Sequence, residues 1–329
     1  MIIQKTLKKF NLTLTTLYLL SCLFIFSNEN YAQDDLIRVD TDLVTIPVTV
    51  LDRDRRYITN VKKEDFQIFE DGIEQEITFF ESVEKPFTIF VLLDVSSSMR
   101  PAIRNLANAA NVFLEQLRPD DYLTAATFDE WVDVLFKVST VKEIRKGKQF
   151  RLRVEASHGD TMVYDAVDFA LKKIKKIRGR KAIVLFSDGI GSGIATSEKS
   201  TLRDAEEGEA LIYTVQFNTL AISPSDKNRL SKASIDLGKQ RLELANWYMR
   251  ELAQKTGGRH FRIEDITDLE KTFGMIADEL GQQYSLGYYP KNQGEAGQKR
   301  SIKVKVRQPN LAVKARESYI VGEQKNKKK

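Results

Sequence analysis

Five oxygen-bearing side chains stand at points of this 329-residue sequence where an apolar run ends or an amphipathic stretch begins. Two are carboxylates and three are hydroxyls: Asp94, Ser96, Ser98, Thr161 and Asp188. The first three follow the apolar run Ile89 to Leu93, and the last follows a second run, Ala182 to Phe186. Such continuous apolar runs are typical of strands buried on both faces of a parallel sheet. Because ligands bind at the carboxyl edge of such a sheet, we expect the five side chains to converge there.

All five side chains offer oxygen as the ligand atom, and this chemistry determines which ion they could bind. Hydroxyl and carboxylate oxygens favour Mg²⁺, or Mn²⁺ and Ca²⁺, over zinc. Zinc sites take sulfur or imidazole ligands, and this chain has only two histidines and one cysteine, Cys22. We interpret His158, three residues before Thr161, as a loop residue and His260 as a surface or packing residue.

The order and spacing of these residues resemble a known cation site. Asp94-Val95-Ser96-Ser97-Ser98, followed by Thr161 and then by Asp188-Gly189, is similar to the metal-ion-dependent adhesion site of von Willebrand factor type A domains. The resemblance extends over residues 86–281. It implies that Ser96, Ser98 and Thr161 bind the ion directly, while Asp94 and Asp188 often act through water. It also implies an open coordination position that accepts an Asp or Glu carboxylate from a partner protein.

Structural interpretations of the same residues stay open. Asp94 and Ser98 could cap the helix that follows, and Asp188-Gly189 could be a turn. For function, we predict a non-enzymatic protein that binds a partner protein through the cation. The alternative is a structural or assembly protein of the cell envelope whose metal only stabilises the fold. A metal-dependent hydrolase is a third hypothesis, but no nearby general base and no G-x-S-x-G elbow speak for it.

Strand and helix patterns alternate between Pro86 and Gly281, which predicts a Rossmann-like, mainly parallel sheet flanked by helices. Beyond the strand that ends at Asp94, the expected strands are residues 122–128, 132–138, 182–186, 211–217 and 260–263. The expected helices are residues 103–117, 163–174, 242–253 and 269–280. Residues 218–239 have no strong periodicity, and we interpret them as a loop that carries a short helix.

Period-two patterns at both ends of the chain predict a β-sandwich built from the N- and C-terminal segments. Pro47, inside the first alternating stretch, is typical of an edge strand. Glu70-Asp71-Gly72 is a hairpin signal, and we interpret its acids as a solvated turn. Residues 66–72 also resemble those of exported bacterial proteins with a von Willebrand-related domain. Further strands are expected at residues 284–288, 302–306 and 311–320.

The predicted domain organisation has five parts. They are a signal peptide at 1–32, an N-terminal β module at 33–85, a von Willebrand type A domain at 86–281, C-terminal strands at 282–322 and a basic tail at 323–329.

The first 32 residues are interpreted as a secretory signal peptide, because a basic start precedes the apolar stretch Phe10 to Phe26 and a cleavage position at Ala32. An uncleaved membrane anchor and a lipoprotein box at Leu20-Ser21-Cys22 are the alternatives. No second stretch is apolar enough to span a bilayer, so we expect no transmembrane helix in the mature chain. We expect an exported protein that is periplasmic, bound to the cell envelope or secreted.

The formal charge of +5 does not indicate nucleic-acid binding. Residues 1–32 carry a net charge of +2 and residues 323–329 one of +3, so the body of the chain is neutral. We therefore expect a protein partner and no nucleic acid.

Overall fold

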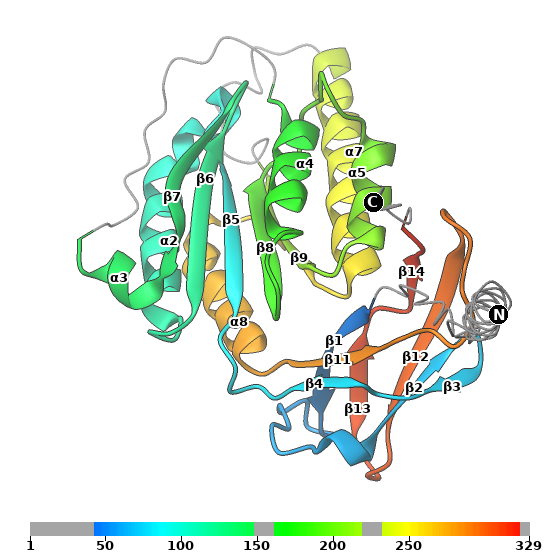
Figure 1. Cartoon of the computed structure of the whole chain (residues 1–329). Helices are drawn as coiled ribbons and strands as arrows, with labels where there is room; N and C mark the ends of the chain where they lie inside the picture. The colour runs from blue at the N-terminus through cyan, green and yellow to red at the C-terminus, as the bar shows by residue number, and fades with distance from the viewer. Residues whose placement is uncertain (1–42, 148–160, 219–231, 323–329) are drawn as a thin grey trace, which may run out of the picture. The chain divides into compact units, whose positions relative to one another are not determined.

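The computed structural model describes residues 43–147, 161–218 and 232–322 (Figure 1). The predicted signal peptide, the lipoprotein alternative at Cys22, His158 and the basic tail lie outside these residues. The described residues belong to one compact unit, Thr41–Lys329. The predicted boundaries at residues 85/86 and 281/282 therefore stay predictions.

A six-stranded sheet carries the two apolar runs singled out in the sequence. Its strands are β5 (Thr88–Asp94), β6 (Tyr122–Phe128), β7 (Val132–Thr140), β8 (Lys181–Ser187), β9 (Leu211–Phe217) and β10 (His260–Ile263). They are ordered β10-β9-β8-β5-β6-β7, and all neighbours are parallel except β7, which is antiparallel to β6 (Figure 1). The predicted mainly parallel sheet is confirmed.

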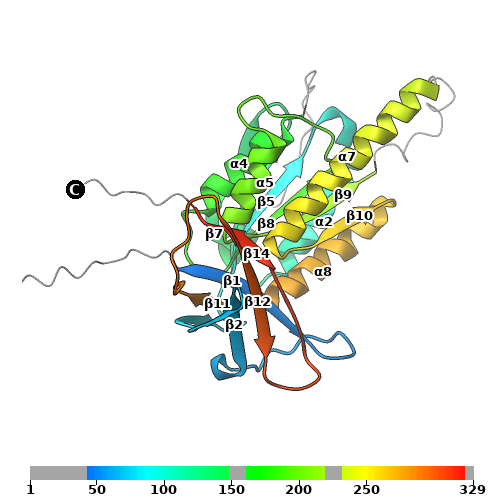
Figure 2. The same ribbon diagram turned by 90° about the vertical axis from the view of Figure 1, so that its right-hand side faces the viewer.

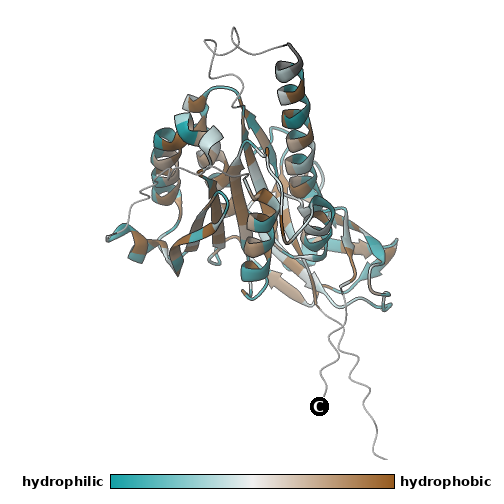
Figure 3. Cartoon of the chain, turned by 90° about the horizontal axis from the view of Figure 1, so that it is seen from above, coloured by the Kyte–Doolittle hydropathy of each residue, from teal (hydrophilic) through white to brown (hydrophobic). Residues whose placement is uncertain are grey.

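Helices cover both faces of this sheet, and Figure 3 shows its apolar strands between helices with polar outer sides. The helices are η2 (Ser97–Ala102), α2 (Ile103–Gln116), α3 (Val141–Arg145), α4 (Val163–Ile174), α5 (Glu198–Glu207), α7 (Lys232–Thr256), η4 (Ile266–Asp268) and α8 (Leu269–Gly281). The alternate residues Ile89, Val91 and Leu93 of β5 pack with α2 and α8, and Phe90 and Leu92 pack with α4 and α7. This two-sided burial explains why the strand is apolar at every position, since each buried side chain of this size contributes about 1.5–3 kcal/mol.

Segments from both ends of the described chain combine into two antiparallel sheets around a shared core. The strands are β1 (Val44–Leu51), β2 (Phe66–Glu70), β3 (Ile73–Gln75), β4 (Phe79–Glu81), β11 (Tyr284–Tyr288), β12 (Lys299–Val306), β13 (Ala312–Ala315) and β14 (Ser318–Ile320), with a short helix η1 (Lys63–Asp65). One sheet has the order β13-β1-β11-β4 and the other β14-β12-β2-β3. The predicted β-sandwich from N- and C-terminal segments is confirmed.

Helix α7 is longer than the sequence pattern indicated. It begins at Lys232, whereas the prediction placed the helix start at Leu242 and a loop before it. Figure 2 shows α7 projecting beyond the neighbouring helices. In its first turns, Asp236, Leu237 and Lys239 are exposed, so they give no apolar stripe to detect. Residues 219–231 of the predicted loop lie outside the described residues.

Two expectations about the sandwich were wrong. β1 is an inner strand, not an edge, but it pairs with β13 only from Val48 onward. Pro47 precedes that pairing, so its missing N–H does not interrupt the ladder with β13. Glu70 is not solvated: it is 2% exposed, and its carboxylate accepts hydrogen bonds from the hydroxyls of Tyr288 and Tyr319 and from Arg300. These partners are distant in sequence, so the local hairpin signal could not reveal them.

Candidate metal centre

The two predicted carboxylates lie at the switch point of the parallel sheet. Asp94 is the last residue of β5, and Asp188 directly follows β8, the strand beside it. From β5 the chain continues towards β6, and from β8 it continues towards β9 on the opposite side. In open α/β sheets, the crevice outside the strand ends at such a point is the usual ligand site.

Asp94 is fully buried and strongly held by neighbouring hydrogen-bond donors. Its Oδ1 accepts a hydrogen bond from the backbone N–H of Ser96 at 2.9 Å, and its Oδ2 accepts one from the hydroxyl of Ser187 at 2.5 Å. Burial, followed by the nearby charge of Asp188, raises the pKa of Asp94 to about 7, although the hydrogen bonds from Ser187 and Ser96 lower it. The two carboxylates therefore lie close enough to interact.

Asp188 is also fully buried, and the backbone after it turns sharply. Its Oδ1 accepts a hydrogen bond from the N–H of Ile190 at 2.9 Å. Gly189 has φ +73°, a conformation that favours glycine, and its N–H donates to the hydroxyl oxygen of Ser187 at 2.8 Å. The strand thus leaves the sheet in a conformation that keeps the carboxylate inside the molecule.

The two serines place their hydroxyls together at the end of β5. The Oγ atoms of Ser96 and Ser98 are 3.1 Å apart. Ser96 precedes η2 without a capping hydrogen bond from its side chain, and α2 starts only at Ile103, preceded by Ala102. These hydroxyls therefore do not cap α2, which removes the structural interpretation for Ser98.

Thr161 lies between two loops of the same sheet edge. Its carbonyl accepts a hydrogen bond from the N–H of Ser192 at 2.8 Å, and the N–H of Met162 donates to the carbonyl of Asp129 at 2.8 Å. Asp129 follows β6, whose last residue is paired with Asp94, and Ser192 belongs to the loop after Asp188. A Cβ atom on Gly191 would lie 2.4 Å from the carbonyl oxygen of Thr161, so this close approach requires glycine.

These residues suit a divalent cation. Two buried acids of the same charge repel each other, and within the described ranges Asp94 forms no ion pair with lysine or arginine. A cation would compensate this charge, and the hydroxyls add neutral oxygen ligands. No group of three or more His, Cys, Asp or Glu side chains able to hold a metal occurs in the described part of the chain, so any such site would depend on hydroxyls. Ion binding by the five residues stays a prediction.

Two residues at this centre were not predicted. Ser187 bridges the ends of β5 and β8, and Gln216 donates a hydrogen bond from Nε2 to the carbonyl of Asp188 at 3.0 Å. The sequence contained a signal for Gln216, because a glutamine inside the apolar run Leu211–Phe217 must find a buried partner. Ser187 directly precedes Asp188, and no local pattern in the sequence singled it out.

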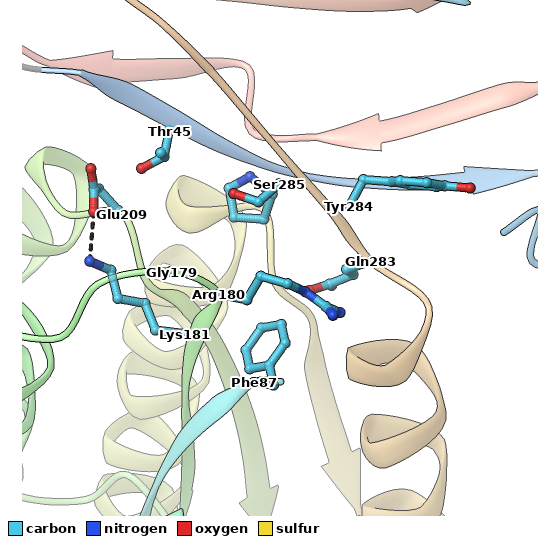
Figure 4. Close-up of a pocket in the computed structure, with 10 residues that line it drawn as sticks. Thr45, Phe87, Gly179, Arg180, Lys181, Glu209, Gln283, Tyr284 and Ser285 are labelled. Carbon is cyan, nitrogen blue, oxygen red and sulfur yellow. Dashed lines mark hydrogen bonds and ion pairs between the residues drawn. The ribbon is translucent and has the colours of Figure 1, made fainter. Parts of the chain in front are cut away.

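Two cavities lined by described residues lie at the opposite, amino-terminal edge of the sheet. One, of about 120 Å³, is lined by Arg118, Arg180 and Asp121 among others. The two guanidinium groups donate to backbone carbonyls, including those of Leu280 and Gly281 at the end of α8. A smaller cavity of about 10 Å³ lies beside Arg180, with its Lys181–Glu209 ion pair (Figure 4). We interpret the two cavities as gaps in the packing between chain segments and not as ligand sites, because Arg118 and Arg180 already donate hydrogen bonds to the backbone of these segments.

The comparisons with known proteins agree with the resemblance in the sequence. Residues 89–190, which include all five predicted ligands, match the family model of the von Willebrand factor type A domain. The comparison with curated proteins finds no match. In the described ranges, no helix has both the length and the apolar character needed to cross a membrane.

Several solved structures are similar to this chain. An aerotolerance-related membrane protein from Bacteroides fragilis is 14% identical, with a TM-score of 0.43 over 60% of this chain and 98% of its own. The ArnB paralog VWA2 from Sulfolobus acidocaldarius is 15% identical, with a TM-score of 0.42 over 85% and 75%. A von Willebrand factor type A protein from Catenulispora acidiphila is 10% identical, with a TM-score of 0.41 over 86% and 74%. Residues 89–190 of this chain are thus similar to a von Willebrand factor type A domain, and they lie within a mainly parallel sheet.

Proposed function

We propose that this protein is non-enzymatic and binds a partner protein through a divalent cation. The cation would be held by Asp94, Ser96, Ser98, Thr161 and Asp188. The observation that carries the proposal is the pair of fully buried, mutually repelling carboxylates beside two adjoining hydroxyls at the switch point of the sheet. Buried like charges destabilise a fold unless they are compensated, so this arrangement supports a bound cation.

The chemistry of the ligand set supports Mg²⁺, with Mn²⁺ and Ca²⁺ as alternatives. The hydroxyls of Ser96, Ser98 and Thr161 carry no charge, so they would leave much of the positive charge of a bound ion uncompensated. Such an ion supplies a site that attracts an anionic ligand. An Asp or Glu side chain of another protein has the charge and the oxygen atoms to fill it.

Export is part of the proposal, and it depends on the basic and apolar pattern of residues 1–32. It places the mature protein in the periplasm, at the cell envelope or outside the cell. The neutral body of the chain favours a protein partner over nucleic acid.

The test is cross-linking and capture of a partner from the envelope of the source cell. The wild type would be used in about 5 mM Mg²⁺, roughly a concentration that saturates a weak site. It would be used again with excess EDTA, which removes the cation. Asp94→Ala removes a carboxylate of the centre, and Asp120→Ala removes an exposed one as the matched control. The proposal expects the same partner band with the wild type and Asp120→Ala in Mg²⁺, and its loss with EDTA or Asp94→Ala.

A second candidate is a structural or assembly protein whose cation only relieves the repulsion between Asp94 and Asp188. A ligand that binds only the native state raises stability by mass action, so Mg²⁺ would raise the melting temperature under both hypotheses. A melting temperature that responds to Mg²⁺, combined with no Mg²⁺-dependent capture, would favour this candidate.

A further inference from the structure

A buried glutamine connects Asp188 to helix α7. Gln216 lies in β9 and is 1% exposed. Its Nε2 donates to the carbonyl of Asp188 at 3.0 Å and to the carbonyl of Leu242, in α7, at 3.3 Å. A buried amide costs free energy unless it is fully paired, so an apolar residue would serve better if packing were its only task.

The orientation of this amide is fixed by a chain of hydrogen bonds. The hydroxyl of Thr214 donates its single hydrogen to the carbonyl of Met249 at 3.0 Å, so it must accept from Nδ1 of His260 at 2.9 Å. Nε2 of His260 then accepts from Nδ2 of Asn246 at 3.2 Å. The same Nδ2 donates to Oε1 of Gln216 at 2.8 Å. The amide nitrogen of Gln216 is therefore directed at Asp188.

Helix α7 also packs directly against the residue that follows Asp188. A Cβ atom on Gly189 would lie 2.7 Å from Sδ of Met249 and 3.1 Å from Cβ of Ala245, both in α7. The peptide between Asp188 and Gly189 is thus held by the Gln216 amide at its carbonyl and by α7 at its α-carbon. Its position decides where the Asp188 carboxylate lies relative to Asp94.

We infer that Gln216 is a positioning residue for Asp188, through which α7 sets the geometry of the proposed cation site. The inference rests on the proposed function, since it concerns the same site. Gln216 donates to the backbone carbonyl of Asp188, so it would act on the site by holding a proposed ligand residue in place. Outer residues that orient metal ligands typically change metal affinity 10- to 100-fold when they are replaced.

The experiment compares two buried glutamines. Gln216→Met removes the amide at the site. Gln283→Met is the matched control, because Gln283 is 2% exposed and its Nε2 donates to the hydroxyl of Tyr213 at 2.8 Å. For each variant, the melting temperature in EDTA reports the structural cost, and titration calorimetry with Mg²⁺ reports the dissociation constant.

We expect both variants to melt at lower temperature than the wild type, but only Gln216→Met to weaken Mg²⁺ binding, by about 10-fold or more. Asn246→Asp, at a half-buried position, is a milder second variant. Its carboxylate has no hydrogen to donate to Oε1 of Gln216, so we expect a smaller loss of Mg²⁺ affinity in the same direction.

The outcomes separate this inference from the function it rests on. If Gln216→Met and Asn246→Asp bind Mg²⁺ as tightly as the wild type while Asp94→Ala does not bind it, the positioning role is refuted and the cation site stands. If Gln283→Met weakens Mg²⁺ binding as much as Gln216→Met, the effect is general destabilisation and the inference also fails. If the wild type binds no divalent cation, both proposals fail.

Discussion

The hydroxyl of Ser187 joins the two strands that carry the buried carboxylates: it donates to Oδ2 of Asp94 at 2.5 Å. The same oxygen accepts the N–H of Gly189 at 2.8 Å, immediately after Asp188. One small side chain therefore fixes the end of β5 and the exit from β8. It also stabilises the ionised form of Asp94 against the effects of burial and of Asp188.

Replacing this hydroxyl should be costly. Ser187→Ala removes a donor from a buried carboxylate and an acceptor from a buried N–H, and we expect the free energy of unfolding in EDTA to fall by about 1–3 kcal/mol. Ser139→Ala is the control, because Ser139 is half-buried and its hydroxyl donates to a neighbouring carbonyl, that of Lys137. Urea denaturation would measure both. Equal stabilities for the two variants would contradict the bridging role.

The pKa of Asp94 predicts how stability without metal depends on pH. This pKa is about 7 in the folded protein against 3.8 as the ordinary value, so between these values the folded state binds more protons than the unfolded state. The stabilisation from proton binding by Asp94 is fully present below pH 4 and is lost as pH rises to 7. The free energy of unfolding should fall by up to about 4 kcal/mol over this range.

The measurement is the free energy of unfolding in EDTA at intervals from pH 4 to pH 8, for wild type and Asp94→Asn. We expect the difference, wild type minus variant, to decrease as pH rises. Saturating Mg²⁺ should abolish the decrease for the wild type. A difference that does not change with pH would show that Asp94 is not the titrating group.

The pKa of His260 predicts the opposite pH dependence of stability, in a pH range that overlaps that of Asp94. Burial, and then the charges of Arg250 and Arg262, lower its pKa from 6.5 to about 4. The unfolded state therefore binds more protons between pH 4 and 6.5, and this contribution to stability is lost as pH falls through that range. His260→Gln should lose this dependence. Comparing the wild type, His260→Gln and the double variant His260→Gln with Asp94→Asn separates the two pH dependences of stability. If the double variant still loses stability as pH falls from 6.5 to 4, His260 is not the titrating group.

The buried acid of the β-sandwich should matter for stability and not for the cation. Glu70 depends on Arg300, whose own side chain is 9% exposed, so Arg300→Ala leaves a buried carboxylate short of its cationic partner. We expect a loss of about 3–5 kcal/mol. Lys303→Ala, exposed on the same strand, should change little. The dissociation constant for Mg²⁺ should be unchanged in Arg300→Ala, and a large change would contradict the separation of the two regions.

The parts of this fold that could be predicted from the sequence are those with a local cause. Ile89 to Leu93 is apolar throughout because both faces of β5 are covered, and Val163–Ile174 shows a helical stripe because one face packs on the sheet. The position of Asp94 and Asp188 at one edge follows from parallel strands. The Ser187–Asp94 hydrogen bond does not, since it depends on which strands are neighbours.

Other features escaped prediction because their causes lie far away in the sequence. The burial of Glu70 depends on Arg300, 230 residues later. In the early part of α7, Asp236, Leu237 and Lys239 are exposed, so this part of the sequence carries no periodic apolar signal. Pro47 fits an inner strand because the pairing of β1 with β13 begins only at Val48.

The most direct test of the central claim is titration calorimetry with Mg²⁺, repeated with Mn²⁺, on wild type, Asp94→Ala and Asp120→Ala. We expect saturable binding of one ion to the wild type and to Asp120→Ala, and no binding to Asp94→Ala. Equal heats for the wild type and Asp94→Ala, or no heat with the wild type, would contradict it.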